Sequence, residues 1–145
     1  MSPDTIFRLC STVALFAWLL LIIVSPLWKR TDKLLIGIVI TLFCIVYAWL
    51  IFSIFQPADI EKFNTLDGVM ALFTNKTLVT AGWVHYLAFD LMTGIWIVNN
   101  ARKYSINHWL TVPALLFTFM LGPVGLLLYL LMRIIKTKKY FAENY

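Results

Sequence analysis

The fold of this chain is decided by the run from Leu34 to Phe55, whose 22 residues read LLIGIVITLFCIVYAWLIFSIF and include no charged side chain. A helix needs about 20 consecutive apolar residues to cross the hydrocarbon core of a bilayer. Over all 145 residues, 61% are hydrophobic and 13% are charged, and the mean hydropathy is +0.85. Soluble domains contain about 25% charged residues. We therefore predict an integral membrane protein and exclude a large water-soluble catalytic domain.

Three further segments have the length and composition of membrane spans. The four predicted spans cover residues 9–28, 34–55, 78–98 and 109–132. The long connection, residues 56–77, mixes charged and apolar side chains, a pattern typical of an interfacial or partly re-entrant helix. The expected fold class is all-α: one membrane domain, residues 1–145, with four transmembrane helices and an interfacial or re-entrant helix between helices 2 and 3.

The net charge of +5 comes from short basic clusters between the apolar runs. Lys and Arg at such positions set membrane topology and contact lipid headgroups, so we expect membrane lipids and no nucleic acid as partners. With four crossings, seven bases share the side of both termini and five lie opposite. The positive-inside rule then places both termini in the cytoplasm, although three bases directly after the first span favour the opposite orientation. The expected location is a bacterial inner membrane or a plastid-type membrane.

Two ionisable side chains, His85 and Asp90, lie inside the third span, where such groups are usually functional. They are five residues apart, which separates them by about 140° around a helix. They therefore cannot touch directly, but both can border one wide groove. Either residue alone is as well explained by packing; the presence of both favours function. The predicted substrate-binding residues on this helix are Trp83, Tyr86, Phe89, Thr93 and Gly94.

The fourth span carries Gly122-Pro123-Val124-Gly125 near its middle. Proline kinks a helix and glycine permits close packing, so a bend is expected here. This motif and Asp90 both fall near the centres of adjacent, antiparallel spans. We therefore predict that the bend faces Asp90 and that Pro123 and Gly125 line the opposite wall of the same groove. Packing alone is the alternative explanation.

Metal and nucleotide chemistry have little support in the sequence. His85 and His108 are too few for a histidine-rich di-iron site, and no H-E-x-x-H motif or phosphate-binding glycine loop occurs. Cys10 and Cys44 lie in apolar runs without redox or zinc spacing. A haem between the two histidines is disfavoured because they lie at different depths. We predict no metal and no cofactor.

The segment Trp83–Leu91, which reads WVHYLAFDL, resembles the abscisic-acid-deficient-four-like family of membrane proteins, whose plant members are neoxanthin synthases. The resemblance extends over nearly the whole chain. Its other main positions are Asp67-Gly68-Val69, Thr77-Leu78, His108 and Gly122-Pro123-Val124-Gly125. One position departs from the family pattern, because Ile95 stands where the family usually has an arginine, five residues after the aspartate.

The resemblance implies a carotenoid-modifying activity, the conversion of an epoxy-xanthophyll such as violaxanthin into the allenic neoxanthin. This reaction is a net isomerisation that needs a general acid, a general base and a dry pocket, but no redox cofactor. Asp90 in its protonated form is the expected acid and His85 the expected base, and the reverse assignment satisfies the same chemistry. The expected ligand is a carotenoid or another isoprenoid lipid.

Two other functions fit the sequence. One is a non-catalytic protein that holds a carotenoid or lipid for a partner membrane protein, or that assembles with itself or with that partner. Ile95 and the short chain favour this alternative. The other is a proton-coupled carrier, which four helices without an internal repeat disfavour.

Overall fold

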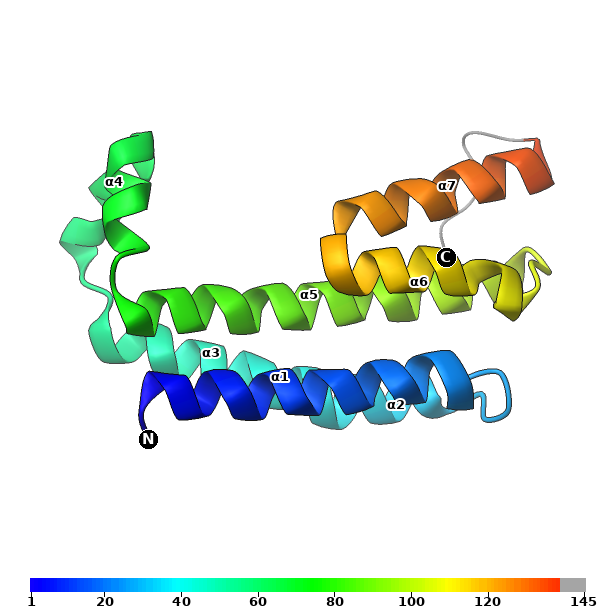
Figure 1. Ribbon diagram of the computed structural model, residues 1–145, viewed down its shortest axis with the longest axis horizontal. Helices are drawn as coiled ribbons and strands as arrows, with labels where there is room; N and C mark the ends of the chain where they lie inside the picture. Colours follow the sequence, from blue (N-terminus) through cyan, green and yellow to red (C-terminus); the bar gives the residue numbers. More distant parts are fainter. Residues whose placement is uncertain (139–145) are drawn as a thin grey trace.

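Three long apolar helices form the body of the molecule (Figure 1). The computed structural model describes residues 1–138, and every regular element in that range is helical. The first long helix consists of α1 (Pro3–Leu19) and a π-helical turn (Leu20–Val24). The second joins α2 (Thr31–Leu34), a π-helical stretch (Leu35–Ile40) and α3 (Thr41–Ile54), and the third is α5 (Lys76–Lys103). All three are long and apolar enough to span a membrane, which agrees with the predicted membrane protein.

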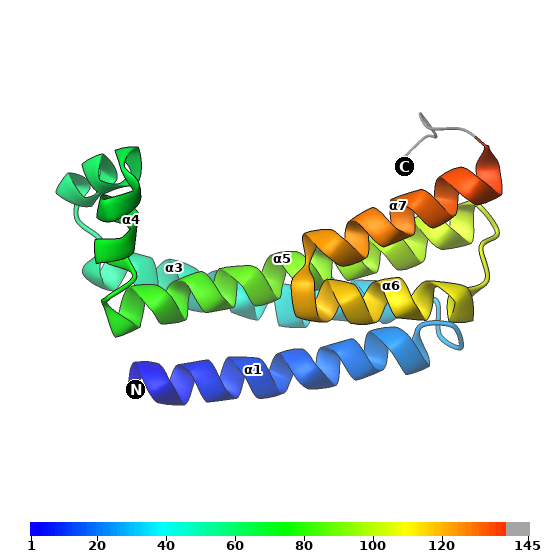
Figure 2. The ribbon, with the colours of Figure 1, turned by 45° about the horizontal axis from the view of Figure 1, so that its top comes forward.

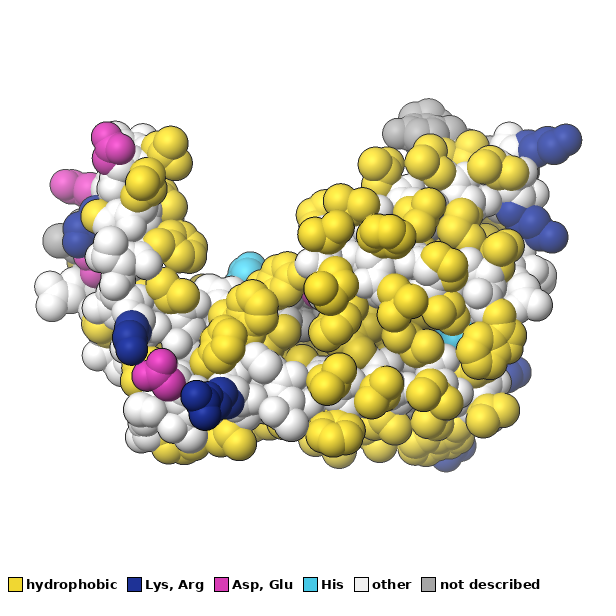
Figure 3. All heavy atoms as spheres, viewed as in Figure 1, with side chains coloured by type: hydrophobic (Ala, Val, Ile, Leu, Met, Phe, Trp, Pro, Cys, Tyr) yellow, Lys and Arg dark blue, Asp and Glu magenta, His cyan; other side chains and the backbone are white. Residues whose placement is uncertain are grey.

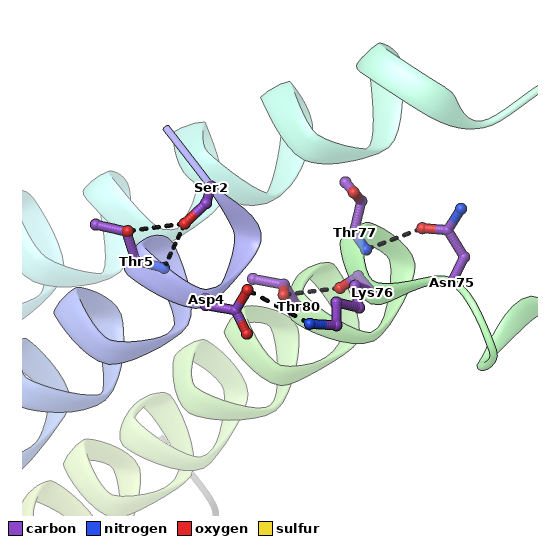
Figure 4. A network of polar contacts seen from close by, with 7 residues as sticks. All are labelled: Ser2, Asp4, Thr5, Asn75, Lys76, Thr77 and Thr80. Carbon is purple, nitrogen blue, oxygen red and sulfur yellow. Dashed lines mark hydrogen bonds and ion pairs between the residues drawn. The ribbon is translucent and has the colours of Figure 1, made fainter.

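The first and third long helices extend beyond the spans predicted from the uncharged segments. The first starts at Pro3 rather than at residue 9, and α5 covers Lys76–Lys103 rather than 78–98. Ser2 caps α1 and Asn75 caps α5, in each case by accepting backbone N–H groups of the first turn. Lys76 Nζ lies 3.6 Å from Asp4 Oδ2 and joins the two helix starts (Figure 4). Polar capping allows these helices to continue beyond their apolar segments.

The connection between α3 and α5 folds into a 3-10 helix (Pro57–Asn64) and α4 (Leu66–Leu72). Both lie at the end of the bundle that holds residue 1, and α4 projects away from α5 (Figures 1 and 2). A hydrogen bond from Lys62 lowers the pKa of Asp59, whose carboxylate also caps the 3-10 helix at Gln56. The structure thus contains helices in the predicted connection. Their position at a membrane interface stays a prediction.

The expected fourth span is not one helix. Its residues form two short antiparallel helices, α6 (His108–Leu121) and α7 (Pro123–Thr137), which lie side by side along one half of α5 (Figures 1 and 2). At 1.5 Å per residue, the 14 residues of α6 extend about 21 Å, less than the hydrocarbon thickness of about 30 Å. The prediction of a continuous span over residues 109–132 is therefore wrong.

The reversal at Gly122 has a local cause and a packing cause. Pro123 has no N–H and disfavours helical backbone in the residue before it, and Gly122 adopts a φ of +40° that other residues rarely take. Gly125 then lies so close to α6 that a Cβ atom would overlap the backbone of Thr118 and Ala114. We name α6, Gly122 and α7 the C-terminal hairpin.

The hairpin changes the arrangement of the chain ends. Residue 1 lies at one end of the long-helix bundle, and α7 ends at the other, beside the loops that follow α1 and α5 (Figure 1). Three long helices and a hairpin separate residue 1 from the end of α7, whereas four antiparallel long helices would bring these two positions to the same end of the bundle. The predicted placement of both termini on one side is therefore not supported.

The core lies around α5, which contacts α1, α3, α6 and α7. Gly94 marks its closest approach to α1, because a Cβ atom there would lie 2.6 Å from the Trp18 ring. Thirteen residues of α5 are buried, and they include Asp90. Many large apolar side chains on the other helices remain exposed, as expected for surfaces that face lipid.

Candidate functional site

Asp90 lies where the C-terminal hairpin meets α5. Its side chain is about nine-tenths buried, with a relative exposure of 9%. A Cβ atom on Gly122 would lie 2.7 Å from Asp90 Oδ1, so the carboxyl group is in contact with the tip of the hairpin. The predicted proximity of Asp90 and the Gly-Pro motif is confirmed, although the motif forms a chain reversal rather than a kink.

The carboxyl group of Asp90 is incompletely paired. Its Oδ2 atom is buried and has no hydrogen-bond partner within residues 1–138. Tyr86, one turn earlier on α5, donates a hydrogen bond of 3.3 Å from its hydroxyl group to the Phe119 carbonyl oxygen of α6. The same hydroxyl group lies close enough to Asp90 to interact with it electrostatically. A buried polar atom without a partner is costly, so this carboxyl group is a candidate to bind or to react with a ligand.

The start of α7 follows the residue that contacts this carboxyl group. Gly122 immediately precedes α7, and no side chain caps its first turn. Leu126 is the first residue of this turn whose backbone N–H group forms a hydrogen bond within the turn, and it donates to the Gly122 carbonyl oxygen. The N–H groups of Val124 and Gly125 therefore lie in the uncapped first turn, where the helix dipole places partial positive charge. The hairpin tip thus combines a buried carboxyl group with the uncapped start of a helix.

His85 has different neighbours. Its ring lies 5.5 Å from the Tyr47 ring of α3 and 4.5 Å from the Phe89 ring, measured between centroids. It lines a cavity of about 300 Å³ between α3, α4 and α5. Asp90 does not line this cavity. The structure therefore brings Asp90 together with the hairpin, and His85 together with α3 and Phe89, but it does not bring the two predicted catalytic residues into contact.

The remaining predicted site residues divide between exposed and packed positions. Trp83 donates a hydrogen bond of 2.9 Å to Ser11 Oγ and its ring lies 5.1 Å from the Phe7 ring, so it joins α5 to α1. Phe89 is 62% exposed, and the Thr93 hydroxyl group donates to the Phe89 carbonyl oxygen.

Three predicted residues lie at helix contacts or at the hairpin tip. Gly94 packs against Trp18, and Gly125 packs within the hairpin. Pro123 is exposed at the hairpin tip. Their roles in substrate binding stay predictions.

The exposed face of α5 lies in a hollow of the molecular surface. Figure 3 shows this hollow between α4 and the C-terminal hairpin, with mostly hydrophobic side chains around it. His85, Phe89, Tyr86 and Asp90 fall in this order within about 140° of the circumference of α5. The groove predicted from spacing alone thus corresponds to a surface on which the two ionisable groups occupy opposite margins.

A polar cluster that the sequence analysis missed holds the hairpin on α5. The Tyr129 hydroxyl group donates to Asn100 Oδ1 at 2.7 Å, and Arg133 Nη1 donates to the same oxygen at 3.2 Å. The Arg133 guanidinium also lies 5.9 Å from the ring centroids of Trp96 and Tyr104. Tyr129 and Arg133 are one helical turn apart, the one signal in the sequence that could have indicated a shared polar face. The span predicted over residues 109–132 leaves Arg133 just outside the membrane segment, whereas this side chain is only 4% exposed.

No group of three or more His, Cys, Asp or Glu side chains that could hold a metal ion occurs in the part of the chain that the structure describes.

A family model, described as ABA DEFICIENT 4-like, matches residues 5–129. The chain belongs to the ABA DEFICIENT 4-like family. The match includes α1, α3 and α5 and extends through the hairpin reversal to Tyr129, so Asp90 and Gly122 both fall within the family region. No curated protein and no solved structure matches the chain.

Proposed function

We propose that this protein is a membrane isomerase of the neoxanthin-synthase type, which converts an epoxy-xanthophyll into an allenic xanthophyll at Asp90. Family membership supports the substrate class. The observation that carries the proposal is the buried carboxyl group of Asp90, which has an unpaired oxygen and contacts the hairpin tip. A reacting end group would reach it from the lipid phase, between α5 and the hairpin.

The separation of His85 from Asp90 changes the expected mechanism. On one helix these residues differ by about 7.5 Å in height and about 140° in direction. An epoxide oxygen and the proton removed next to the ring lie much closer together than that. We therefore assign both proton transfers to the site at Asp90 and remove His85 from the chemical step.

A single carboxyl group can perform both transfers. The epoxide C–O bond breaks as its oxygen takes the proton from one carboxyl oxygen. A C–H bond next to the ring breaks as the other carboxyl oxygen takes that proton, and the released electron pair forms the new C=C bond of the allene. The carboxyl group ends in its starting state, so atoms and electrons balance without an oxidant or reductant. The uncapped start of α7 follows Gly122, which contacts Asp90, and its N–H groups would stabilise negative charge that develops on the oxygen.

Pigment analysis after incubation with an epoxy-xanthophyll in proteoliposomes tests this function. We expect an allenic product from the native chain and a loss of turnover of about 10²–10⁴-fold in Asp90→Asn, because the amide cannot transfer the proton. Leu127→Ala, at an exposed position of α7, is the control and should retain activity. Thermal unfolding must show that Asp90→Asn still folds. Full turnover by a folded Asp90→Asn variant would refute the assignment.

A non-catalytic carotenoid holder is the second candidate. Ile95 favours it, because this buried side chain, 2% exposed, replaces the arginine usual in the family and supplies no charge near Asp90. Stoichiometry separates the two functions: an enzyme converts many substrate molecules per chain, whereas a holder co-purifies with pigment at a constant ratio.

The hairpin also supports a membrane orientation in which residue 1 faces away from the cytoplasm. This orientation is opposite to the one predicted from four crossings. Besides the buried Arg133, seven bases of the described chain then lie at the end where α7 finishes, namely Lys29, Arg30, Lys33, Arg102, Lys103, Lys136 and Lys138, and three lie at the other end, Arg8, Lys62 and Lys76. We propose that the first end faces the cytoplasm or its plastid equivalent and that residue 1 faces away. In this orientation the three bases directly after the first span lie on the cytoplasmic side together with most of the other bases.

A further inference from the structure

The cavity beside His85 is separate from the site at Asp90. Aromatic side chains form much of its wall: Tyr47 from α3, Phe55 directly after α3, Phe63 from the 3-10 helix and Phe73 directly after α4. Gly82 keeps its floor open, because even a Cβ atom at this position would contact the Phe73 ring at 3.4 Å. A volume of about 300 Å³ is at the lower end of the range for small-molecule sites and suits one ring rather than a whole carotenoid.

His85 is the one histidine, acid or base that lines this cavity. Within the described residues the imidazole has ring contacts with Tyr47 and Phe89 and no hydrogen bond. A neutral imidazole has one donor and one acceptor nitrogen, which match a hydroxyl group because that group also donates and accepts. The aromatic wall carries no cation, so it does not suit a phosphate or carboxylate. The chemistry points to an apolar ring that bears a hydroxyl group.

The cavity and the site at Asp90 are too close together to hold the two ends of one carotenoid. His85 and Asp90 differ by only about 7.5 Å in height along α5. A carotenoid is about as long as the hydrocarbon core is thick, about 30 Å. Binding of a ring in the cavity is therefore a property of the cavity itself.

We propose that this cavity is an anchoring site for a hydroxyl-bearing ring of a membrane-dissolved isoprenoid, with its hydroxyl group hydrogen-bonded to His85. The isoprenoid class rests on the proposed function, whereas the requirement for an apolar ring with a hydroxyl group rests on the cavity itself. His85 is then a binding residue, and Gly82 determines whether a ring fits.

Fragment binding to the purified full-length chain in detergent micelles tests the proposal. The probes are 3-hydroxy-β-ionone, which has the hydroxylated ring, and β-ionone, which lacks the hydroxyl group, each measured by saturation-transfer NMR. We expect the native chain to prefer the hydroxylated probe by about 2- to 10-fold, the equivalent of one hydrogen bond. His85→Phe should abolish this preference while it still binds the ring, and Gly82→Leu should weaken both probes. Val79→Leu, a conservative change at a position of α5 that does not line the cavity, is the matched control.

Two results would overturn the anchoring site. One is equal binding of the two probes to the native chain with no effect of His85→Phe. The other is loss of binding in Asp90→Asn with full binding in Gly82→Leu, since the probe would then occupy the hairpin site. Thermal unfolding checks that Gly82→Leu folds, and His85→Phe supplies the test if it does not. Absence of isomerase turnover would remove the proposed function but would leave these binding results unchanged.

Discussion

Gly122→Ala tests the contact on which the candidate site depends. Two costs are expected from the structure. The φ of +40° at this position disfavours an L-residue by about 1–2 kcal/mol. The added Cβ atom would also lie 2.7 Å from Asp90 Oδ1, and relief of such an overlap in a packed interior costs about 1–3 kcal/mol. The variant should therefore lose about 2–5 kcal/mol of stability.

A double-mutant cycle separates these two costs. In an Asp90→Ala background the carboxyl group is absent, so Gly122→Ala should cost only the backbone part, about 1–2 kcal/mol. The difference between the two backgrounds, about 1–3 kcal/mol, measures the contact between Asp90 and the hairpin tip. Denaturant titration of the purified chain in mild detergent, followed by tryptophan fluorescence, gives the four free energies of unfolding. An equal cost in both backgrounds would show that Asp90 does not touch Gly122, and the candidate site would then be wrong.

Two further changes test the hairpin and its orientation. Tyr129→Phe removes the hydrogen bond to Asn100 and should lower the free energy of unfolding by about 0.5–1.5 kcal/mol. Leu127→Ala, on the exposed side of the same helix, is the control and should change the free energy of unfolding little. Equal losses in both variants would argue against this hydrogen bond as an anchor of the hairpin. Single cysteines at Lys136 and Lys62 should react with an impermeant thiol reagent from opposite faces of a sealed membrane, and labelling from the same face would instead support four crossings.

His85 and Asp90 have different expected roles. Loss of His85 should weaken the binding of a hydroxylated ring in the cavity, and loss of the proton-transferring group at Asp90 should lower kcat. The sequence analysis assigned acid and base roles to this pair because both are ionisable residues within one span. Their neighbours in the structure separate these roles: the exposed side chain of His85 lies beside aromatic rings and an apolar cavity, and the residue that precedes α7 contacts Asp90.

Sequence alone determined the features that depend on local composition. Uncharged runs such as Leu34–Phe55 must form helices in a bilayer, because hydrocarbon offers no partner for backbone N–H and C=O groups. The same reasoning identified Asp90 as a candidate site residue, since an ionisable group inside a span is expensive unless it has a function. The proximity of Asp90 to the Gly-Pro motif followed from the similar depths of two adjacent segments.

Only the tertiary structure decided between a kink and a reversal at Gly122. A Gly-Pro pair is compatible with a kink or a reversal. Both conformations can contain a proline, which has no N–H group, and a glycine with an unusual backbone angle. The choice depends on contacts between distant parts of the chain, including the hydrogen bond from Tyr129 to Asn100 and the close packing of Gly125 on α6. The cavity beside His85 has the same origin, because its lining residues from α3, the connection and the start of α5 come together only in the folded chain. Periodicity reports the faces of one helix, whereas the partner of each face is determined by packing across the whole chain.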